Sequence, residues 1–361
     1  MSDWSSGREE DVDFRRIQRT RGDEIFEPGL DVEPPDTREF RPPIRLAGWA
    51  LVALCAVLTP SVFGPLGLSA ATRTLALATA LLGLQVLLGH AGLLSLGHGA
   101  LIGIGAWLTG VVVTEMGVAV ELAIPLAALV GAGVGVLIGL PALRVQGIGL
   151  ALLTLALAVS FPVLHRKFVG PLGKVYDKLV PPVWTGLQPG DDELWSYVLA
   201  VIATTVVYLA LRELLGGRFG RSLRAVRDDP VAAAAFGVPV ARIQLGAFAL
   251  SSAAAGVAGA ILVARTPFVS GADYPFQFSI QLFAVALLVG ADRLLGALGG
   301  AIVMTQLPRA LSGLGWVGLE DLIYAVVLLV IIRGFRGRGV GPWLRDQLVT
   351  TRLGQPRKRP T

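Results

Sequence analysis

The chain contains 361 residues, of which 53% are hydrophobic and 16% are charged, and its mean hydropathy is +0.67. Soluble domains carry about 25% charged residues, so this composition excludes an ordinary soluble protein. The formal net charge of +5 suits the arginine-rich cytoplasmic loops of a membrane protein rather than nucleic-acid binding, and the single cysteine, Cys55, excludes an internal disulfide.

The first 45 residues form a polar segment of mixed charge that contains several prolines. No apolar core follows a short basic start, so this segment is not a signal peptide, and its composition predicts a disordered tail. The sequence is therefore divided into a cytoplasmic tail over residues 1–45, a transmembrane domain over 46–333 and a basic cytoplasmic tail over 334–361.

Apolar blocks long enough to cross a bilayer predict an all-α, polytopic membrane bundle of about ten transmembrane helices. A membrane β-barrel would show shorter, alternating segments. The expected spans are Leu46–Phe63, Ala70–Leu88, Gly99–Val113, Val118–Leu140, Gly147–Leu164, Trp195–Leu211, Leu245–Val263, Phe278–Gly290, Leu294–Leu311 and Glu320–Ile332. If the amino terminus is inside, 24 of the 31 Lys and Arg residues fall on the inner side, so both termini are expected in the cytoplasm.

A glycine-rich stretch, GHAGLLSLGHG, runs from Gly89 to Gly99 between the second and third expected spans. Glycines at this density break or loosen a helix. Two interpretations stay open: a broken helix along a substrate pathway, or a tight turn at the cytoplasmic face. For the pathway, the candidate residues are Gly89, Gly92, Ser95, Gly97 and His98, together with Thr154 in the fifth span.

Small residues recur at four-residue spacing in several spans, as in Gly131, Gly135 and Gly139, and in Ser252, Gly256 and Ala260. Such stripes let helix backbones approach closely in lipid. They are explained either by simple bundle packing or by helices that slide during a transport cycle.

A long polar segment, Arg212–Gln244, interrupts the apolar blocks. Its first half places arginines opposite three apolar residues that share one helical face, Phe219, Leu223 and Val226. Asp229 is expected to cap a second helix, from Pro230 to Phe236, which Gly237 ends. Charge alone would be explained by a solvated loop, but two capped helices indicate a rigid projection that contacts a soluble partner.

Motifs that would supply chemistry are missing from the sequence. No phosphate-binding pattern GxxxxGK[ST] occurs, and no acidic pair is embedded in a span. The histidines, cysteine and carboxylates show no metal-ligand or catalytic spacing. The chain is therefore expected to have no cofactor and not to be an enzyme.

Four stretches of this chain resemble the permease subunits of branched-chain amino acid ABC importers, specifically the M-type member of the pair. They are GLQVLLGHAGLLSLGHGALIGIGAW from Gly83, LRVQGIGLALLTLALA from Leu143, GRFGRSLRAVRDDPVAAAAFGVPVARIQLGAFALSSAAAGVAGAIL from Gly217, and FSIQLFAVALLVGADRLLGALGGAIV from Phe278. The resemblance covers most of the membrane part and implies the fold of an ABC importer permease.

The resemblance also implies a coupling helix within Arg212–Gln244 that contacts an ATPase. The residues that match this motif are Arg221, Arg224, Ala232, Ala233 and Gly237, with Asp229 as the helix cap, whereas the family usually has an acidic residue where Ala234 stands. The implied partners are ABC ATPase subunits, a second permease subunit, a periplasmic or lipid-anchored solute-binding protein and the lipid bilayer. The implied location is the bacterial inner membrane.

The function implied by the resemblance is half of a translocation pathway for branched-chain or other small neutral amino acids, driven by a separate ATPase. Uptake of urea or short amides by a member of the same family is one alternative. An ATP-independent secondary transporter or channel is another, although it would require embedded ionisable residues or a filter-like repeat. The third alternative is a membrane scaffold without a pathway.

Overall fold

Helices make up almost all of the described chain. The computed structural model describes residues 67–143, 148–176, 192–290, 294, 296–313, 319, 322–326 and 329, which all belong to one compact unit, Ala56–Thr361. The first described helix, Gly67–His90, ends in a π-helical turn, η1 (Val86–His90). The elements that follow are α3 (His98–Met116), α4 (Val120–Ala142), α5 (Ile148–Val169), β1 (Lys174–Val175), α6 (Asp192–Gly216), α7 (Arg218–Asp228), α8 (Pro230–Ala235), α9 (Val240–Arg265), β2 (Phe268–Val269), η3 (Gly271–Asp273), α10 (Phe276–Val289) and α11 (Gly296–Gly313).

Seven helical segments among these residues are long and apolar enough to cross a membrane: Gly67–His90, His98–Met116, Val120–Pro141, Gly149–Val169, Asp192–Gly216, Val240–Arg265 and Gly271–Val289. They coincide with the second to eighth expected spans, which confirms a polytopic helical protein. The ninth expected span forms α11, which is helical but is not among the seven. The first expected span, most of the tenth and both tails (1–45 and 334–361) lie outside the described residues, so the number of ten stays a prediction.

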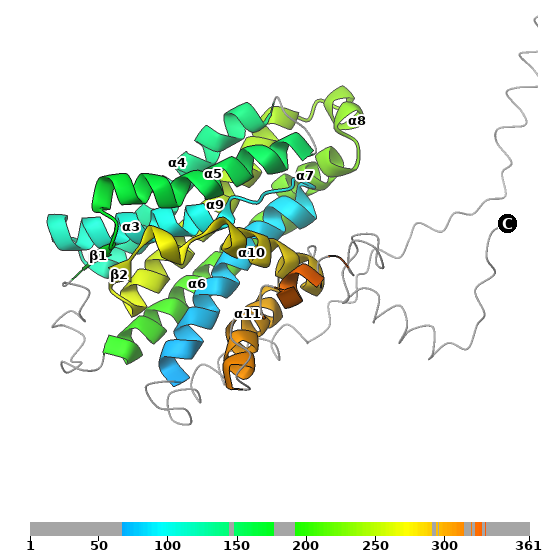
Figure 1. The fold of residues 1–361 in the computed structure, drawn as a ribbon. Coiled ribbons are helices and arrows are strands. Elements are labelled where there is room, and N and C mark those ends of the chain that lie inside the picture. The colour runs from blue at the N-terminus through cyan, green and yellow to red at the C-terminus, as the bar shows by residue number, and fades with distance from the viewer. Residues whose placement is uncertain are drawn as a thin grey trace, which may run out of the picture. The chain divides into compact units, whose positions relative to one another are not determined.

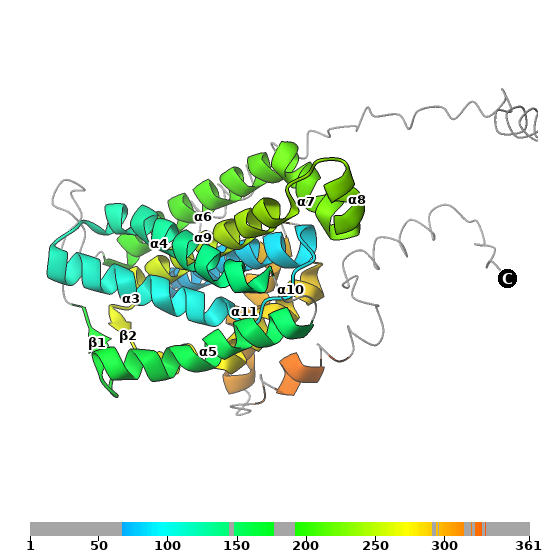
Figure 2. The same ribbon diagram turned by 90° about the horizontal axis from the view of Figure 1, so that it is seen from above.

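Helix α9 runs through the bundle in Figures 1 and 2 and packs closely against α3 and α4. A Cβ atom added to Gly131 of α4 would lie 2.5 Å from the backbone oxygen of Ser252. A Cβ atom at Gly105 of α3 would overlap the backbone of Gly256. Larger side chains would force these helices apart, so the small residues lie at close contacts between helices, and sliding of these helices during transport stays a prediction.

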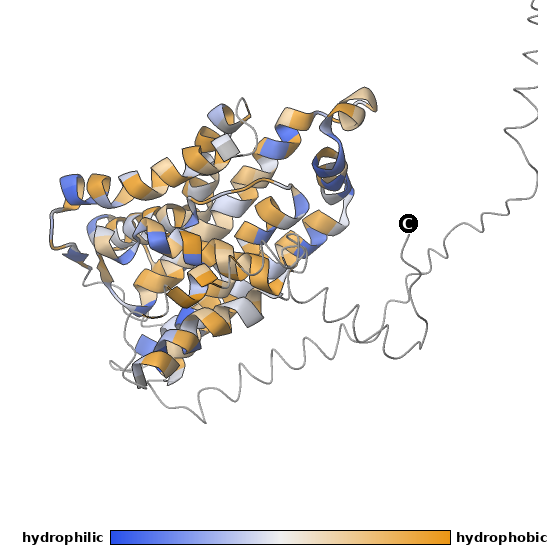
Figure 3. Ribbon diagram, turned by 45° about the vertical axis from the view of Figure 1, so that its right-hand side comes forward, coloured by the Kyte–Doolittle hydropathy of each residue, from blue (hydrophilic) through white to orange (hydrophobic). Residues whose placement is uncertain are grey.

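The two ends of the bundle carry different elements. Helices α7 and α8 lie together at one end, on the right of Figures 1 and 2, and the two strands lie at the opposite end. There β1 pairs antiparallel with β2, with Lys174 opposite Val269. In Figure 3 the strongly hydrophilic colour gathers at α7, whereas the long helices are mostly hydrophobic. The polar segment is therefore a separate structure at one end of the bundle.

Candidate functional site

Helix α7 is the amphipathic helix that the sequence predicts. Leu223 and Val226 are buried, whereas Arg221 on the other face is exposed. Phe219 packs against α9, where a Cβ atom at Gly246 would lie 2.9 Å from its ring. The apolar face of α7 therefore rests on protein, and its basic face is left accessible.

Helix α8 begins at the cap that the sequence predicts. One carboxylate oxygen of Asp229, Oδ1, accepts hydrogen bonds from the backbone nitrogens of Val231 at 2.9 Å and Ala232 at 3.0 Å. Pro230 occupies the first helical position, where its missing N–H costs nothing. Only Asp229 separates α7 from α8, so the two helices meet at a short and well-defined corner.

The residues at the end of α8 also determine where this helix stops. Gly237 has φ of +79°, a conformation that glycine adopts without strain. Its nitrogen donates to the carbonyl oxygen of Ala234 at 2.9 Å, and the next nitrogen, of Val238, donates to Ala233 at 3.0 Å. The helix ends at Ala235, one residue before the predicted end at Phe236, because Phe236 forms the cap.

The surface of α8 is apolar at two positions. Val231 is 79% exposed and Phe236 is 89% exposed, although α8 is far too short to cross a membrane. Of the residues that match the coupling motif, Ala232 is exposed and Ala233 is buried. The position at which the family usually has an acidic residue, Ala234, is exposed as well.

The glycine-rich stretch forms a real break between two helices, and we call residues 86–97 the helix break. The first helix widens into the π-turn, in which the nitrogen of Ala91 donates to the oxygen of Val86 at 3.0 Å. Gly92 then has φ of +68°, and the chain stays non-helical until α3 begins at His98. Ser95 is buried in this non-helical stretch.

Side chains from three other helices hold the inner end of the break. The hydroxyl of Thr154 on α5 accepts a hydrogen bond from the nitrogen of Leu96 at 2.9 Å. The hydroxyl of Ser279 on α10 accepts one from the nitrogen of Gly99 at 3.0 Å. A Cβ atom at Gly97 would lie 2.8 Å from the backbone oxygen of Thr154, so only glycine allows this approach.

The third of these side chains, Ser251 on α9, bridges the two sides of the break. Its hydroxyl donates to the carbonyl oxygen of Gly83 at 2.7 Å and lies 2.9 Å from Nε2 of the fully buried His98. Because the hydroxyl has one proton, Nε2 of His98 must be the donor in the second bond. Ser251 lies about 16 Å along α9 from Val240, so the break enters the bundle rather than turning at its surface.

One arginine of α7 holds the outer end of the break. Nη1 of Arg227 donates to the carbonyl oxygen of Gly89 at 2.5 Å, and Nε lies 3.0 Å from a carboxylate oxygen of Asp228. A Cβ atom at Gly92 would lie 2.7 Å from Cγ of Arg227. The polar segment and the helix break, which are far apart in the sequence, are therefore in direct contact.

The structure divides the predicted site residues into two groups. Gly97, His98 and Thr154 come together inside the bundle, whereas Gly89 and Gly92 lie beside α7. Sequence reasoning missed three polar side chains that hold the break, Ser251, Ser279 and Arg227. Ser251 and Ser279 are hydroxyl residues within apolar spans, and this pattern could have indicated a buried polar contact. Arg227 could not be distinguished from the other arginines of the basic face. No group of His, Cys, Asp and Glu in the described chain is placed to hold a metal ion.

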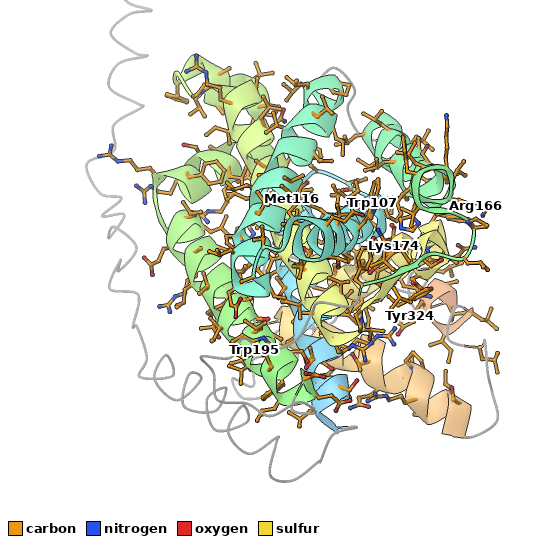
Figure 4. The ribbon with its side chains drawn as sticks, turned by 90° about the vertical axis from the view of Figure 1, so that its left-hand side faces the viewer. Trp107, Met116, Arg166, Lys174, Trp195 and Tyr324 are labelled. Carbon is orange, nitrogen blue, oxygen red and sulfur yellow. The ribbon has the colours of Figure 1, made fainter. Side chains whose placement is uncertain are left out.

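The opposite end of the bundle faces the viewer in Figure 4, where Lys174 and Met116 are labelled. Lys174 forms an exposed ion pair with Glu115, with 2.6 Å between Nζ and Oε1. The same Nζ lies 5.6 Å from the ring centre of Tyr176. Burial, and to a lesser extent the charge of Glu115, raise the pKa of Tyr176 to about 12. Local contacts therefore hold the segment around β1 against α3 at this end.

Comparison with known proteins gives a consistent family. Residues 67–332 match the family described as the branched-chain amino acid transport system permease component. The high-affinity branched-chain amino acid transport system permease protein LivM of Salmonella typhimurium (strain LT2) is 29% identical over 293 residues, which cover 74% of this chain and 68% of that protein. The LivM protein of Escherichia coli (strain K12) is 28% identical over 326 residues, which cover 82% of this chain and 76% of that protein.

Relatives with other names also match the chain. The autoinducer 2 import system permease protein LsrC of Klebsiella pneumoniae is 31% identical over 215 residues, which cover 57% of this chain and 59% of that protein. No solved structure matches the chain. Because the family match extends over most of the chain and includes both the helix break and the polar segment, this protein belongs to the family of branched-chain amino acid transport system permease components.

Proposed function

We propose that this chain is one permease subunit of an ABC importer and forms half of a pathway for branched-chain or other small neutral amino acids. Separate ATPase subunits drive the transport, and a second permease subunit and a periplasmic or lipid-anchored solute-binding protein complete the assembly. The observation that carries this proposal is the structure of α7 and α8, a rigid projection from one end of a membrane bundle.

The docking of an ATPase rests on the surface of α8. Val231 and Phe236 expose apolar side chains on a segment outside the seven spans, and the described bundle does not cover them. A short helix with apolar anchors suits a groove on a soluble partner. Because Ala234 contributes no charge, the contact depends on shape and apolar burial more than on an ion pair. With the ten spans expected from the sequence, the proposal implies that α8 and both termini are cytoplasmic.

We infer the substrate class from the names of the relatives and from the side chains inside the bundle. The LivM proteins of Salmonella typhimurium and Escherichia coli match 74% and 82% of this chain, and LsrC of Klebsiella pneumoniae matches 57%. The side chains around the inner end of the break are neutral hydroxyls and a histidine, which suits a zwitterionic solute without net charge. Autoinducer 2 is the second candidate, because its permease is 31% identical to this chain. Urea and short amides remain a third class to test.

The docking surface is tested with one pair of variants and one control. The double variant Val231→Ser and Phe236→Ser should reduce co-purification of the ATPase subunits by about tenfold, since it removes most of the exposed apolar area of α8. Leu172→Ser, at the opposite end, is the matched control because Leu172 is 86% exposed. Equal loss in both variants, or none in either, would rule out α8 as the docking element.

The energy source and the solute are tested by uptake into cells that lack other importers. Uptake of labelled leucine, isoleucine or valine should stop when ATP is depleted and continue when the ion gradients collapse. The opposite response would indicate a secondary transporter. Autoinducer 2 and urea, measured in parallel, would identify the other two substrate classes.

A further inference from the structure

We infer that Arg227 is a positioning residue that transmits displacement of α7 and α8 to the helix break. The inference rests on the proposed function, because it assigns a role in transport to a contact between the docking element and the pathway. It is based on a hydrogen bond, a close steric contact and the order of the elements in the chain. None of these belongs to the ATPase contact itself.

The hydrogen bond satisfies a backbone group that the break leaves without a partner. The last carbonyl groups of a helix receive no hydrogen bond from its own backbone. The turn at Val86–His90 leads into non-helical chain, so the carbonyl of Gly89 is one of these groups. The guanidinium of Arg227 donates to the oxygen of Gly89 at 2.5 Å. A cation is also favourable at the negative end of a helix. Loss of Arg227 would therefore remove this donor from the carbonyl oxygen of Gly89, at the end of the first helix.

The Arg227 side chain also lies close to Gly92, which limits compression between α7 and the break. The side chain of Arg227 lies against Gly92, where an added Cβ atom would come within 2.7 Å of Cγ. Gly92 also has φ of +68°, so another residue would be strained there even without the contact. The hydrogen bond resists separation of α7 from the break, and the steric contact resists compression.

The chain order makes Arg227 the shortest link between docking and pathway. Arg227 is two residues before Asp229, the cap of α8, so a force on α8 reaches it through the last residues of α7. The far end of the break is held independently by Thr154 and Ser279. A shift of α7 at Gly89 therefore changes the conformation of the residues between these two attachments.

The test separates transmission from docking. The full transporter with its ATPase is reconstituted in proteoliposomes, and solute uptake and ATP hydrolysis are both measured. Arg227→Met should keep ATP hydrolysis within about twofold while uptake per ATP falls about tenfold, since the docking surface is intact but its movement is not passed on. Arg227→Lys, which can still donate to Gly89, should recover part of that ratio. The matched control is Arg218→Met, because Arg218 is an exposed arginine at the start of the same helix.

Two results would overturn the inference. Uptake per ATP that is the same in Arg227→Met and Arg218→Met would show that Arg227 transmits nothing. A parallel fall of uptake and hydrolysis, without a change in their ratio, would show that Arg227 serves folding or docking instead. If the unmodified protein shows no ATP-driven uptake at all, the proposed function fails first.

Hydrogen exchange of the purified chain examines the contact without any ATPase. Arg227→Met should accelerate exchange in residues 91–97 by about tenfold and leave α4 and α9 unchanged, because it opens one local unit. Gly92→Ala should act on the same residues, and the combined variant should add little to either change. Unchanged exchange in residues 91–97 would overturn the structural basis of the inference, whatever the transport result.

Discussion

Helix α8 and the helix break are both short departures from the long helices, but they are stabilised in opposite ways. The ends of α8 are fixed by residues within the segment, Asp229 and Gly237. The break is fixed by side chains from α5, α7, α9 and α10, which are distant in the sequence. It follows that α8 can move as a unit without losing its own structure, whereas the break responds to movement of any of four helices.

The largest effect on stability is expected from Gly97→Val, at the inner end of the break. The added side chain would meet the backbone of Thr154, which cannot move away as a flexible side chain could. Overpacking of this kind costs about 1–3 kcal/mol, so the melting temperature of the purified protein should fall by several degrees. Gly133→Val is the control, since a Cβ atom at Gly133 of α4 meets nothing within 4 Å. Equal melting temperatures for the two variants would mean that the break is not tightly held.

A smaller fall in melting temperature is expected from Ser251→Ala. The variant removes the hydroxyl that donates to the carbonyl of Gly83 and that lies 2.9 Å from Nε2 of the buried His98. Hydrogen bonds within membrane bundles contribute about 0.6–1.7 kcal/mol each, which is less than the steric clash at Gly97. The measurement is again the melting temperature, with Ser160→Ala as the control.

Ser160 is a suitable control because its hydroxyl also donates to a helix backbone oxygen, that of Ala156, but on an exposed face of α5. If both serine variants had the same small effect, then the bonds of Ser251 to the neighbouring helices would stabilise the protein no more than a bond within one exposed helix. The connection between α9 and the break would in that case rest on packing alone.

The difference between a helix fixed by local residues and a break fixed by distant ones also explains what the sequence could predict. Asp229, Pro230 and Gly237 act within three residues of where they stand, so both short helices could be placed from the sequence, with one end wrong by one residue. The buried face of α7 followed from spacing for the same reason. The existence of the break was also readable from its glycines, but a surface turn and an inserted break have the same local sequence.

A surface turn and an inserted break differ in their contacts with residues that are far away in the sequence. The bond from Arg227 to Gly89 joins residues 138 positions apart, and the bond from Gly99 to Ser279 joins residues 180 apart. No local pattern encodes such pairs, so Arg227 could be recognised as part of a basic face but not as a partner of the break. The seven described spans were found because their signal, a long apolar run, is again local.

The smallest effect on the melting temperature is expected from Asp229→Ala, although its effect on transport should be clear. Loss of a helix cap costs about 0.5–2 kcal/mol, but here the cost falls on α8 alone, which contributes one buried side chain, Ala233, and little else to the core. Hydrogen exchange in residues 231–237 should therefore accelerate while the melting temperature stays within about 1 °C of the unmodified protein, because α8 opens as a separate unit. Asp229→Asn should behave like the unmodified protein, since asparagine is an equally good cap. A fall in melting temperature as large as that of Gly97→Val would mean that α8 is part of the core, and the contrast between a self-contained helix and a break held by its neighbours would no longer hold.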